Sequence, residues 1–194
     1  GGEIQRSFPG LSCVAALKSP STGIVDTQSL IQSLVLDFEA AGGLLHCHAH
    51  VLRIETSAGL AQAVLEDGTL VTADIVINSA GLNALRLVPP GVEHSYENFY
   101  LKGSYFSYTG GVPFKTLVYP LPSQGGLGIH LTLDLAGRAR FGPDTLAVSN
   151  PDFTVRPEDR LKFGAAVKQY WPGCNVKKLS PDYAGIRPKL KLEG

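Results

Sequence analysis

The residues best suited to chemistry lie in the stretch from Leu117 to Asp144. From Gly128 to Leu135 apolar residues alternate with polar ones, and the polar set is His130, Thr132 and Asp134. Strict alternation is typical of a strand with one buried face and one polar face. An imidazole titrates near neutral pH and exchanges protons readily, and Tyr119 on a predicted neighbouring strand could join it. This face could therefore form the floor of a ligand site; the alternative is an ordinary solvated polar face.

Three histidines form a second candidate group. His46, His48 and His50 alternate along a strand predicted over 44–55, which would put all three on one face. Their spacing of about 7 Å per step is too wide for one ion unless a bulge or another strand helps. The three cysteines lie far apart without CxxC spacing, which argues against a zinc site or a disulfide scaffold and fits a reducing compartment. We therefore expect no metal and a polar strand face.

The first half of the chain contains several predicted elements that could position such residues. The apolar stripe from Thr27 to Ala41 predicts an amphipathic helix, with Asp26 as its N-cap and Gly42-Gly43 as its C-cap. Asp67-Gly68 predicts the turn of a hairpin over 62–72. The run Ile75–Ile77 is typical of a strand buried on both faces. It ends at Asn78-Ser79-Ala80-Gly81, whose small side chains would let a ligand or a helix approach the backbone.

The second half predicts an antiparallel arrangement. We expect strands over 99–108 and 117–121, a turn containing Gly125 and Gly126, the strand 128–135 and its return over 138–141, and a helix over 161–170. Residues 88–93 predict a linker and 151–160 a surface connection. The fold class is α+β, with an irregular segment over 1–23, one domain over 24–88 and a second over 89–194.

Composition excludes several classes of function. The formal net charge of zero gives no electrostatic footprint for nucleic acid or membrane surfaces. No apolar run approaches the roughly 20 residues of a transmembrane segment, and residues 1–10 carry no signal-peptide pattern. The sequence contains no methionine, so we expect it to be a piece of a longer protein.

The order of elements, ending in ADIVINSAG, resembles the middle of flavoprotein oxidoreductases of the D-amino-acid oxidase and glycine oxidase superfamily. KGSYF, LVYPLP, GLGIHLTLDL, FGPD and YAGIRPK resemble the substrate domain of its L-2-hydroxyglutarate dehydrogenase branch, over most of residues 98–190. The resemblance implies FAD as cofactor, part of a Rossmann-like FAD-binding domain over 24–88, and an antiparallel-sheet substrate domain over 89–194.

The resemblance also implies roles for residues. Val51 would contact the adenine end of the cofactor through its backbone, and Ser79, Ala80 and Gly81 would pass close to FAD. The G-x-R-P arginine, Arg187, would hold a substrate carboxylate; the alternative is a surface ion pair.

Two gaps and one departure limit the resemblance. The G-x-G-x-x-G turn that binds the FAD pyrophosphate would lie before Gly1, and the C-terminal segment that closes over the flavin is absent too. A five-carbon dicarboxylate needs two cations, for which Lys102 or Lys189 would join Arg187. Lys102 stands where some relatives carry arginine, so substrate preference could differ.

The first functional hypothesis is FAD-dependent oxidation of a small 2-hydroxy acid, L-2-hydroxyglutarate to 2-oxoglutarate, by hydride transfer to flavin, with an unknown electron acceptor. His130 would be the base or only an orienting donor, Tyr105 and Tyr119 would orient the substrate, and Thr132 would hydrogen-bond it. The alternatives are an amino-acid oxidase of the same superfamily and a non-catalytic dicarboxylate-binding module. We expect a cytoplasmic or mitochondrial location.

Overall fold

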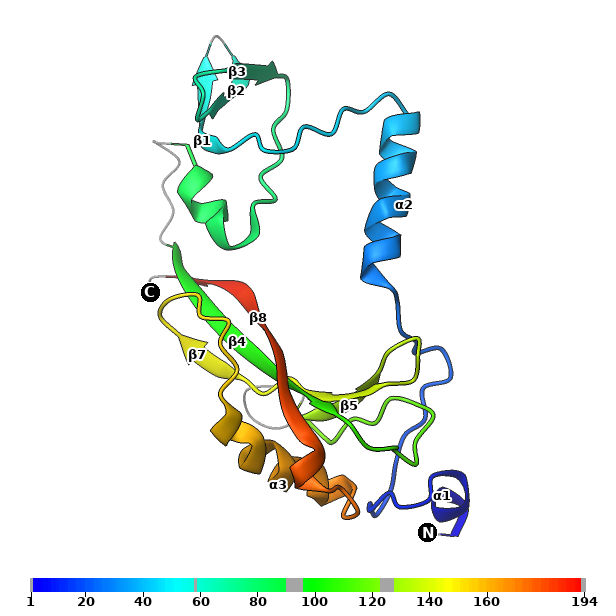
Figure 1. The fold of residues 1–194 in the computed structure, drawn as a ribbon. Helices are drawn as coiled ribbons and strands as arrows, with labels where there is room; N and C mark the ends of the chain where they lie inside the picture. The colour runs from blue at the N-terminus through cyan, green and yellow to red at the C-terminus, as the bar shows by residue number, and fades with distance from the viewer. Residues whose placement is uncertain (1, 58, 90–95, 123–127, 193–194) are drawn as a thin grey trace. The chain divides into compact units, whose positions relative to one another are not determined.

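The computed structural model describes residues 2–57, 59–89, 96–122 and 128–192. Within it the chain divides into two compact units (Figure 1). Unit 1 contains Gly1–Asp26 and Tyr100–Arg187, and unit 2 contains Thr27–Phe99 and Pro188–Gly194. The segment 1–23, predicted to be irregular, begins with the helix α1 (Gly2–Ser7) and belongs to unit 1.

The sheet of unit 1 is antiparallel in each strand pair whose register is defined. Its strands follow the order β5-β6-β4-β7, and β8 also pairs with β4. They are β4 (Tyr96–Tyr108), β5 (His130–Leu133), β6 (Ala139–Gly142), β7 (Leu146–Val148) and β8 (Leu179–Leu192). The predicted antiparallel sheet and the α+β class are therefore confirmed.

Strand register divides this sheet into two faces. Phe141 lies opposite both Phe106 and Leu131, and these three side chains are completely buried. Because neighbouring residues of a strand point to opposite faces, Arg140 points the other way, with its Cα partners Ser107 and Thr132. We call the first side the core face and the second the polar face.

The core face of the sheet packs against α3 (Arg160–Tyr170), as the apolar stripe of 161–170 predicts. The rings of Phe106 and Phe163 lie 4.5 Å apart, and Val167 on the same helix is completely buried. Each such buried side chain contributes about 1.5–3 kcal/mol to folding. The short helices η2 (Pro157–Asp159) and η3 (Val176–Lys178) lie on either side of α3 in the sequence. The packing of α3 on the core face therefore holds the strands in place, and the same strands carry the polar face on their other side.

A tight turn joins β5 to β6. Asp134 Oδ1 accepts hydrogen bonds from the backbone N–H groups of Ala136 and Arg138, each at 2.9 Å, and Gly137 adopts a φ of +76°. The strand predicted over 117–121 is wrong, since this stretch forms only a single bridge, between Val118 and Leu131. The predicted glycines at 125 and 126, and positions 90–93 of the predicted linker, lie outside the described residues.

In unit 2 the predicted helix is confirmed as α2 (Thr27–Ala40). Its end is a Schellman cap: Gly42, at φ +88°, donates from its N–H to Glu39, and Gly43 donates to Phe38. Its apolar stripe packs against nothing within the described chain, where no α2 residue is buried and Leu30 and Leu34 are about half exposed.

Unit 2 also contains the antiparallel sheet β1-β2-β3, formed by β1 (Val51–Ser57), β2 (Leu60–Leu65) and β3 (Leu70–Ala73). The Asp67-Gly68 turn is confirmed, because Gly68 has a φ of +87° and Asp67 Oδ1 accepts from the N–H of Thr69 at 2.9 Å.

The buried strand predicted over 75–77 is wrong. Residues 75–80 have no regular structure, and Ile75 and Ile77 are 78% and 82% exposed. An apolar run forms a buried strand only where neighbouring strands form hydrogen bonds with its backbone and other elements cover both of its faces. No described strand pairs with this segment. The short helix η1 (Gly81–Leu87) follows it.

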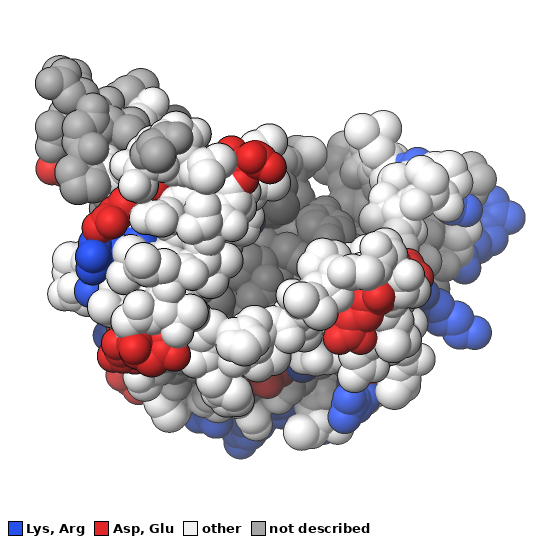
Figure 2. All heavy atoms as spheres, turned by 90° about the horizontal axis from the view of Figure 1, so that it is seen from above, with Lys and Arg blue, Asp and Glu red and all other residues white. Residues whose placement is uncertain are grey.

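On the face shown in Figure 2, acidic and basic side chains form small separate groups. No helix among the described residues is long and apolar enough to cross a membrane.

Candidate functional site

The polar face of the unit 1 sheet brings His130 and Tyr119 into direct contact. Their rings stack with centroids 4.1 Å apart and planes 17° apart. Val118 bridges to Leu131 on the core face, so the next residues of both segments, Tyr119 and Thr132, point to the polar face with His130. His130 is only 7% exposed, which excludes the alternative of a fully solvated face at this position.

The surroundings of His130 set the tautomer of its ring and lower its pKa. Nδ1 lies 3.2 Å from the carbonyl oxygen of Gly128, and because a carbonyl only accepts, Nδ1 carries the hydrogen. Burial lowers the pKa of His130 below its usual value of 6.5, although the Gly128 hydrogen bond opposes this effect. In the neutral ring Nε2 therefore carries a lone pair. The imidazole can accept a proton at that atom.

Tyr105 lies on the same face and stacks on Tyr183 of β8, with ring centroids 4.6 Å apart and planes 18° apart. A glycine makes room for it. Gly142 has a φ of +144°, and a Cβ built there would lie 2.7 Å from Tyr105 Cδ1 and 2.6 Å from the backbone oxygen of Ser104. No other residue type fits at this position without displacing Tyr105.

Two arginines act on Tyr105. Burial raises the pKa of its hydroxyl, Tyr183 and Tyr119 raise it further, and the positive charges of Arg187 and Arg140 oppose the rise. Arg187 is exposed, and among the described residues no carboxylate forms an ion pair with it. The surface ion pair considered as its alternative role is therefore absent from the described part of the chain, and Arg187 can bind an anion.

The structure does not bring the predicted Lys102 to this group. Lys102 alternates with Phe106 on the core face, is 5% exposed, and donates from Nζ to Asp152 Oδ2 at 2.8 Å and to the carbonyl of Thr154 at 2.5 Å. Its charge is thus balanced on the side of the sheet opposite Tyr105. Lys189 belongs to unit 2.

The residues proposed to contact the cofactor lie in unit 2. Val51 begins β1, pairs with Leu65 and is half-buried. Ser79 and Ala80 are exposed, and Gly81 has a φ of +57° with open space where a side chain would stand.

Asn78 holds this turn. Its side chain donates to the carbonyl of Ala84 at 2.8 Å and accepts from the N–H of Ala80 at 3.2 Å. A hollow of about 330 Å³ lies against Asn78, Gly81 and Leu85. Exposed backbone with small side chains, held in a fixed turn beside a hollow, fits the close approach of a planar cofactor.

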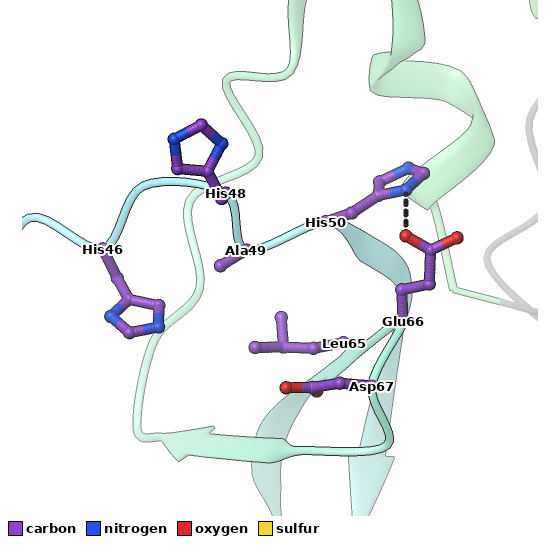
Figure 3. Close-up of a pocket in the computed structure, with 7 residues that line it drawn as sticks. All are labelled: His46, His48, Ala49, His50, Leu65, Glu66 and Asp67. Carbon is purple, nitrogen blue, oxygen red and sulfur yellow. Dashed lines mark hydrogen bonds and ion pairs between the residues drawn. The ribbon is translucent and has the colours of Figure 1, made fainter.

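The three histidines form a different arrangement from the predicted one. The strand begins only at Val51, so His46, His48 and His50 precede it, and His48 lies in a turn with a φ of +59°. They line a hollow of about 230 Å³, and His50 pairs with Glu66 at 3.3 Å. Figure 3 shows that the three rings point in different directions. No group of three metal-binding side chains occurs in the described part of the chain.

Sequence reasoning gave no role to Arg140 or Tyr183. The guanidinium of Arg140 lies 5.0 Å from the ring centroid of Tyr183, and its Nε donates to Asp182 Oδ2 at 2.5 Å. The sequence did contain a signal for Arg140. If 128–135 and 138–141 pair, alternate residues of the second segment lie on opposite faces, so that Arg138 and Arg140 share the face of Thr132 and Phe141 lies on the other. Nothing local indicated the contact with Tyr183, which comes from a strand some forty residues later.

The comparisons with known proteins agree with this architecture. The chain is 35% identical to the mitochondrial L-2-hydroxyglutarate dehydrogenase of Arabidopsis thaliana over 98% of this chain and 49% of the relative. It is 26% identical to the monomeric sarcosine oxidase of Bacillus sp. over 90% of this chain and 48% of that protein. The structure of glycine oxidase from Geobacillus kaustophilus matches with a TM-score of 0.71 at 18% identity, over 99% of this chain and 50% of that one.

The chain thus spans about half the length of these curated relatives. The family model described as FAD dependent oxidoreductase, DAO, matches residues 1–194, so the chain belongs to the DAO family of FAD-dependent oxidoreductases.

Proposed function

We propose that the protein containing this chain oxidises a small 2-hydroxy acid with FAD as cofactor, and that L-2-hydroxyglutarate is its substrate. The observation that carries the proposal is a buried, neutral His130 on the sheet face of Tyr105, together with Arg187, an arginine whose charge acts on Tyr105 and which has no ion pair in the described chain. The 35% identity to an L-2-hydroxyglutarate dehydrogenase supports the choice of substrate.

In this proposal each side chain of the unit 1 site has its own role in binding or deprotonating the substrate. Arg187 binds the carboxylate next to the reacting carbon, because a planar guanidinium pairs with a carboxylate at two points. His130 accepts the hydroxyl proton at Nε2 and keeps its orientation through Nδ1 and Gly128. Tyr105 and Tyr119 orient the substrate, and Thr132 donates a hydrogen bond to it.

Bound FAD would supply the two-electron redox chemistry of the reaction. In unit 2, the backbone of Val51 and the segment Ser79–Gly81 would hold it. We expect a cytoplasmic or mitochondrial location, which subcellular fractionation of cells expressing the protein would test.

A second candidate function is oxidation of an amino acid. The 26% identity to a sarcosine oxidase over 90% of the chain favours it. Such a substrate shares the carboxylate that Arg187 would bind, but it presents an amine in place of the hydroxyl.

An absorbance spectrum of the purified full-length protein separates these readings. We expect a flavin spectrum that bleaches when L-2-hydroxyglutarate is added without oxygen. A flavin that stays oxidised with this acid but bleaches with sarcosine or glycine would replace the first candidate by the second. The absence of flavin would refute both and favour a non-catalytic dicarboxylate-binding module.

A further inference from the structure

We infer that Arg140 is the second carboxylate-binding residue of the site and selects dicarboxylate over monocarboxylate substrates. The inference rests on the proposed function and names a residue that determines its specificity. Lys102, one of the two lysines expected for this role from charge alone, faces the opposite side of the sheet and is balanced by Asp152.

Arg140 lies on the polar face one pair of residues along the strands from His130. Its Cα partner across β5 is Thr132, and Gly142, two residues further along β6, is the partner of His130. Successive rows on one face of a strand are about 7 Å apart. The carboxyl carbons of an extended five-carbon dicarboxylate are roughly 5 Å apart, from carbon–carbon bonds of about 1.5 Å. A substrate whose hydroxyl meets His130 and whose chain runs toward Thr132 would therefore bring its second carboxylate to the part of the face that carries Arg140.

The guanidinium of Arg140 is held in place with donors left over. Its Nε donates to Asp182, and its Cζ lies over the ring of Tyr183, 5.0 Å from the centroid. Arginine has five N–H donors, and no partner for the terminal nitrogens of Arg140 is recorded among the described residues. A pre-oriented fork loses little freedom when a carboxylate binds.

The electrostatics agree with this geometry. The charges of both Arg140 and Arg187 act on the hydroxyl of Tyr105, so both cations lie within electrostatic range of this one residue. Burial works against the charge of Arg140, but the hydrogen bond and the charge of Asp182 outweigh it and raise its pKa. Asp182 offsets one positive charge, so the affinity of Arg140 for a second carboxylate rests on directed N–H donors.

Binding of two 2-oxo acids of equal length, 2-oxoglutarate and 2-oxopentanoate, tests the inference without turnover. Calorimetric titration of the full-length FAD-loaded protein should show tighter binding of 2-oxoglutarate. In Arg140→Met the Kd for 2-oxoglutarate should rise by about 10- to 150-fold, the loss of one charge-assisted hydrogen-bonding partner, while the Kd for 2-oxopentanoate stays the same. Arg140→Lys, which keeps the charge without the planar fork, should show a smaller loss confined to 2-oxoglutarate and serves if the methionine variant does not fold.

Two variants separate this role from a structural one. Arg138→Met is the matched control, because Arg138 also pairs through Nε with an aspartate, Asp134, but is 82% exposed. It should bind both acids as the wild type does. Asp182→Asn removes the carboxylate charge while keeping an acceptor for Nε, and it should retain the preference for 2-oxoglutarate. If Arg140→Met weakens the binding of both acids by the same factor, Arg140 only supports the fold and the inference fails.

The wild-type measurements distinguish failure of the inference from failure of the proposed function. Equal Kd values for the two acids in the wild type overturn the inference even if L-2-hydroxyglutarate bleaches the flavin. A preference that disappears in Arg140→Met upholds the dicarboxylate site even if no 2-hydroxy acid reduces the flavin, in which case the proposed oxidation alone is refuted.

Discussion

Replacing His130 by asparagine tests the central chemical assignment. The asparagine amide can still donate to the carbonyl of Gly128, as Nδ1 does at 3.2 Å, so the local hydrogen bond is retained. The substitution removes Nε2, the only atom of His130 that can accept a proton, and it also removes the ring stacked on Tyr119.

The size of the effect distinguishes a base from a packing residue. A stacked pair contributes about 0.5–1.5 kcal/mol, so loss of stacking alone slows the reaction by at most about tenfold. General base catalysis contributes about 10²- to 10⁴-fold. We therefore expect His130→Asn to lower the rate constant of flavin reduction by at least about 10²-fold.

The pH profile gives a second signature with a defined sign. A protonated imidazole cannot accept the hydroxyl proton, so the rate constant falls as pH drops through the pKa of His130. Since burial lowers that pKa, the wild-type rate should stay on its plateau down to below pH 6.5 before it falls. His130→Asn should abolish this acid limb.

The assay is anaerobic stopped-flow bleaching of the flavin with saturating L-2-hydroxyglutarate, from pH 5 to pH 9. Tyr119→Phe is the comparison variant, because it keeps a ring against His130 and removes only the hydroxyl that would orient the substrate. It should leave the acid limb of the pH profile in place. A loss of less than about tenfold in His130→Asn, with the acid limb unchanged, would show that the histidine only orients the substrate and that the base is another group.

Three further predictions follow from the same geometry. Arg187→Met should raise the Kd of 2-oxopentanoate by about 10- to 150-fold in calorimetric titration, whereas an unchanged Kd would show that another residue holds the first carboxylate. Gly142→Ala should lower the free energy of unfolding by about 1–3 kcal/mol in urea and weaken 2-oxoglutarate binding, because its Cβ collides at 2.6 Å with backbone; Gly111→Ala, with nothing within 4 Å, should do neither. The hydrogen bond from Lys102 is the largest cause of the lowered pKa of Asp152. In the wild type the stability should therefore fall as pH drops below 3.8, because the unfolded carboxyl then binds a proton that the folded one does not. Lys102→Met should make this fall in stability less steep. Equal slopes of melting temperature against pH in both proteins would contradict that account.

Local signals in the sequence predicted much of the fold. The Gly42-Gly43 cap and the Asp67-Gly68 turn depend on backbone conformations that glycine adopts freely, and both are confirmed. The alternation in 99–108 predicted β4, and the stripe in 161–170 predicted α3. These features depend on neighbours within a few residues, which a single sequence displays.

Features that depend on distant partners were not predictable in the same way. The run Ile75–Ile77 reads as a buried strand, but its neighbours would have to come from elsewhere, and no described strand pairs with it. The sequence alone left His130 either in a ligand site or on a solvated polar face, and only its burial and its contact with the ring of Tyr119 decide between the two. Lys102 was chosen as a substrate anchor from its charge alone. The alternation of residues in 99–108 already puts Lys102 on the same face as Phe106 and on the face opposite Tyr105.

The same alternation explains how one short sheet can hold a core and a site together. Tyr105 and Phe106 are consecutive in β4, and Arg140 and Phe141 are consecutive in β6, yet one member of each pair lies on the polar face and the other is completely buried. The buried phenylalanines fix the strands against α3 and so fix the positions of the polar side chains on the far side. A site built on a sheet in this way inherits its rigidity from core packing, whereas its specificity is set by residues such as Arg140 that contribute little to that core.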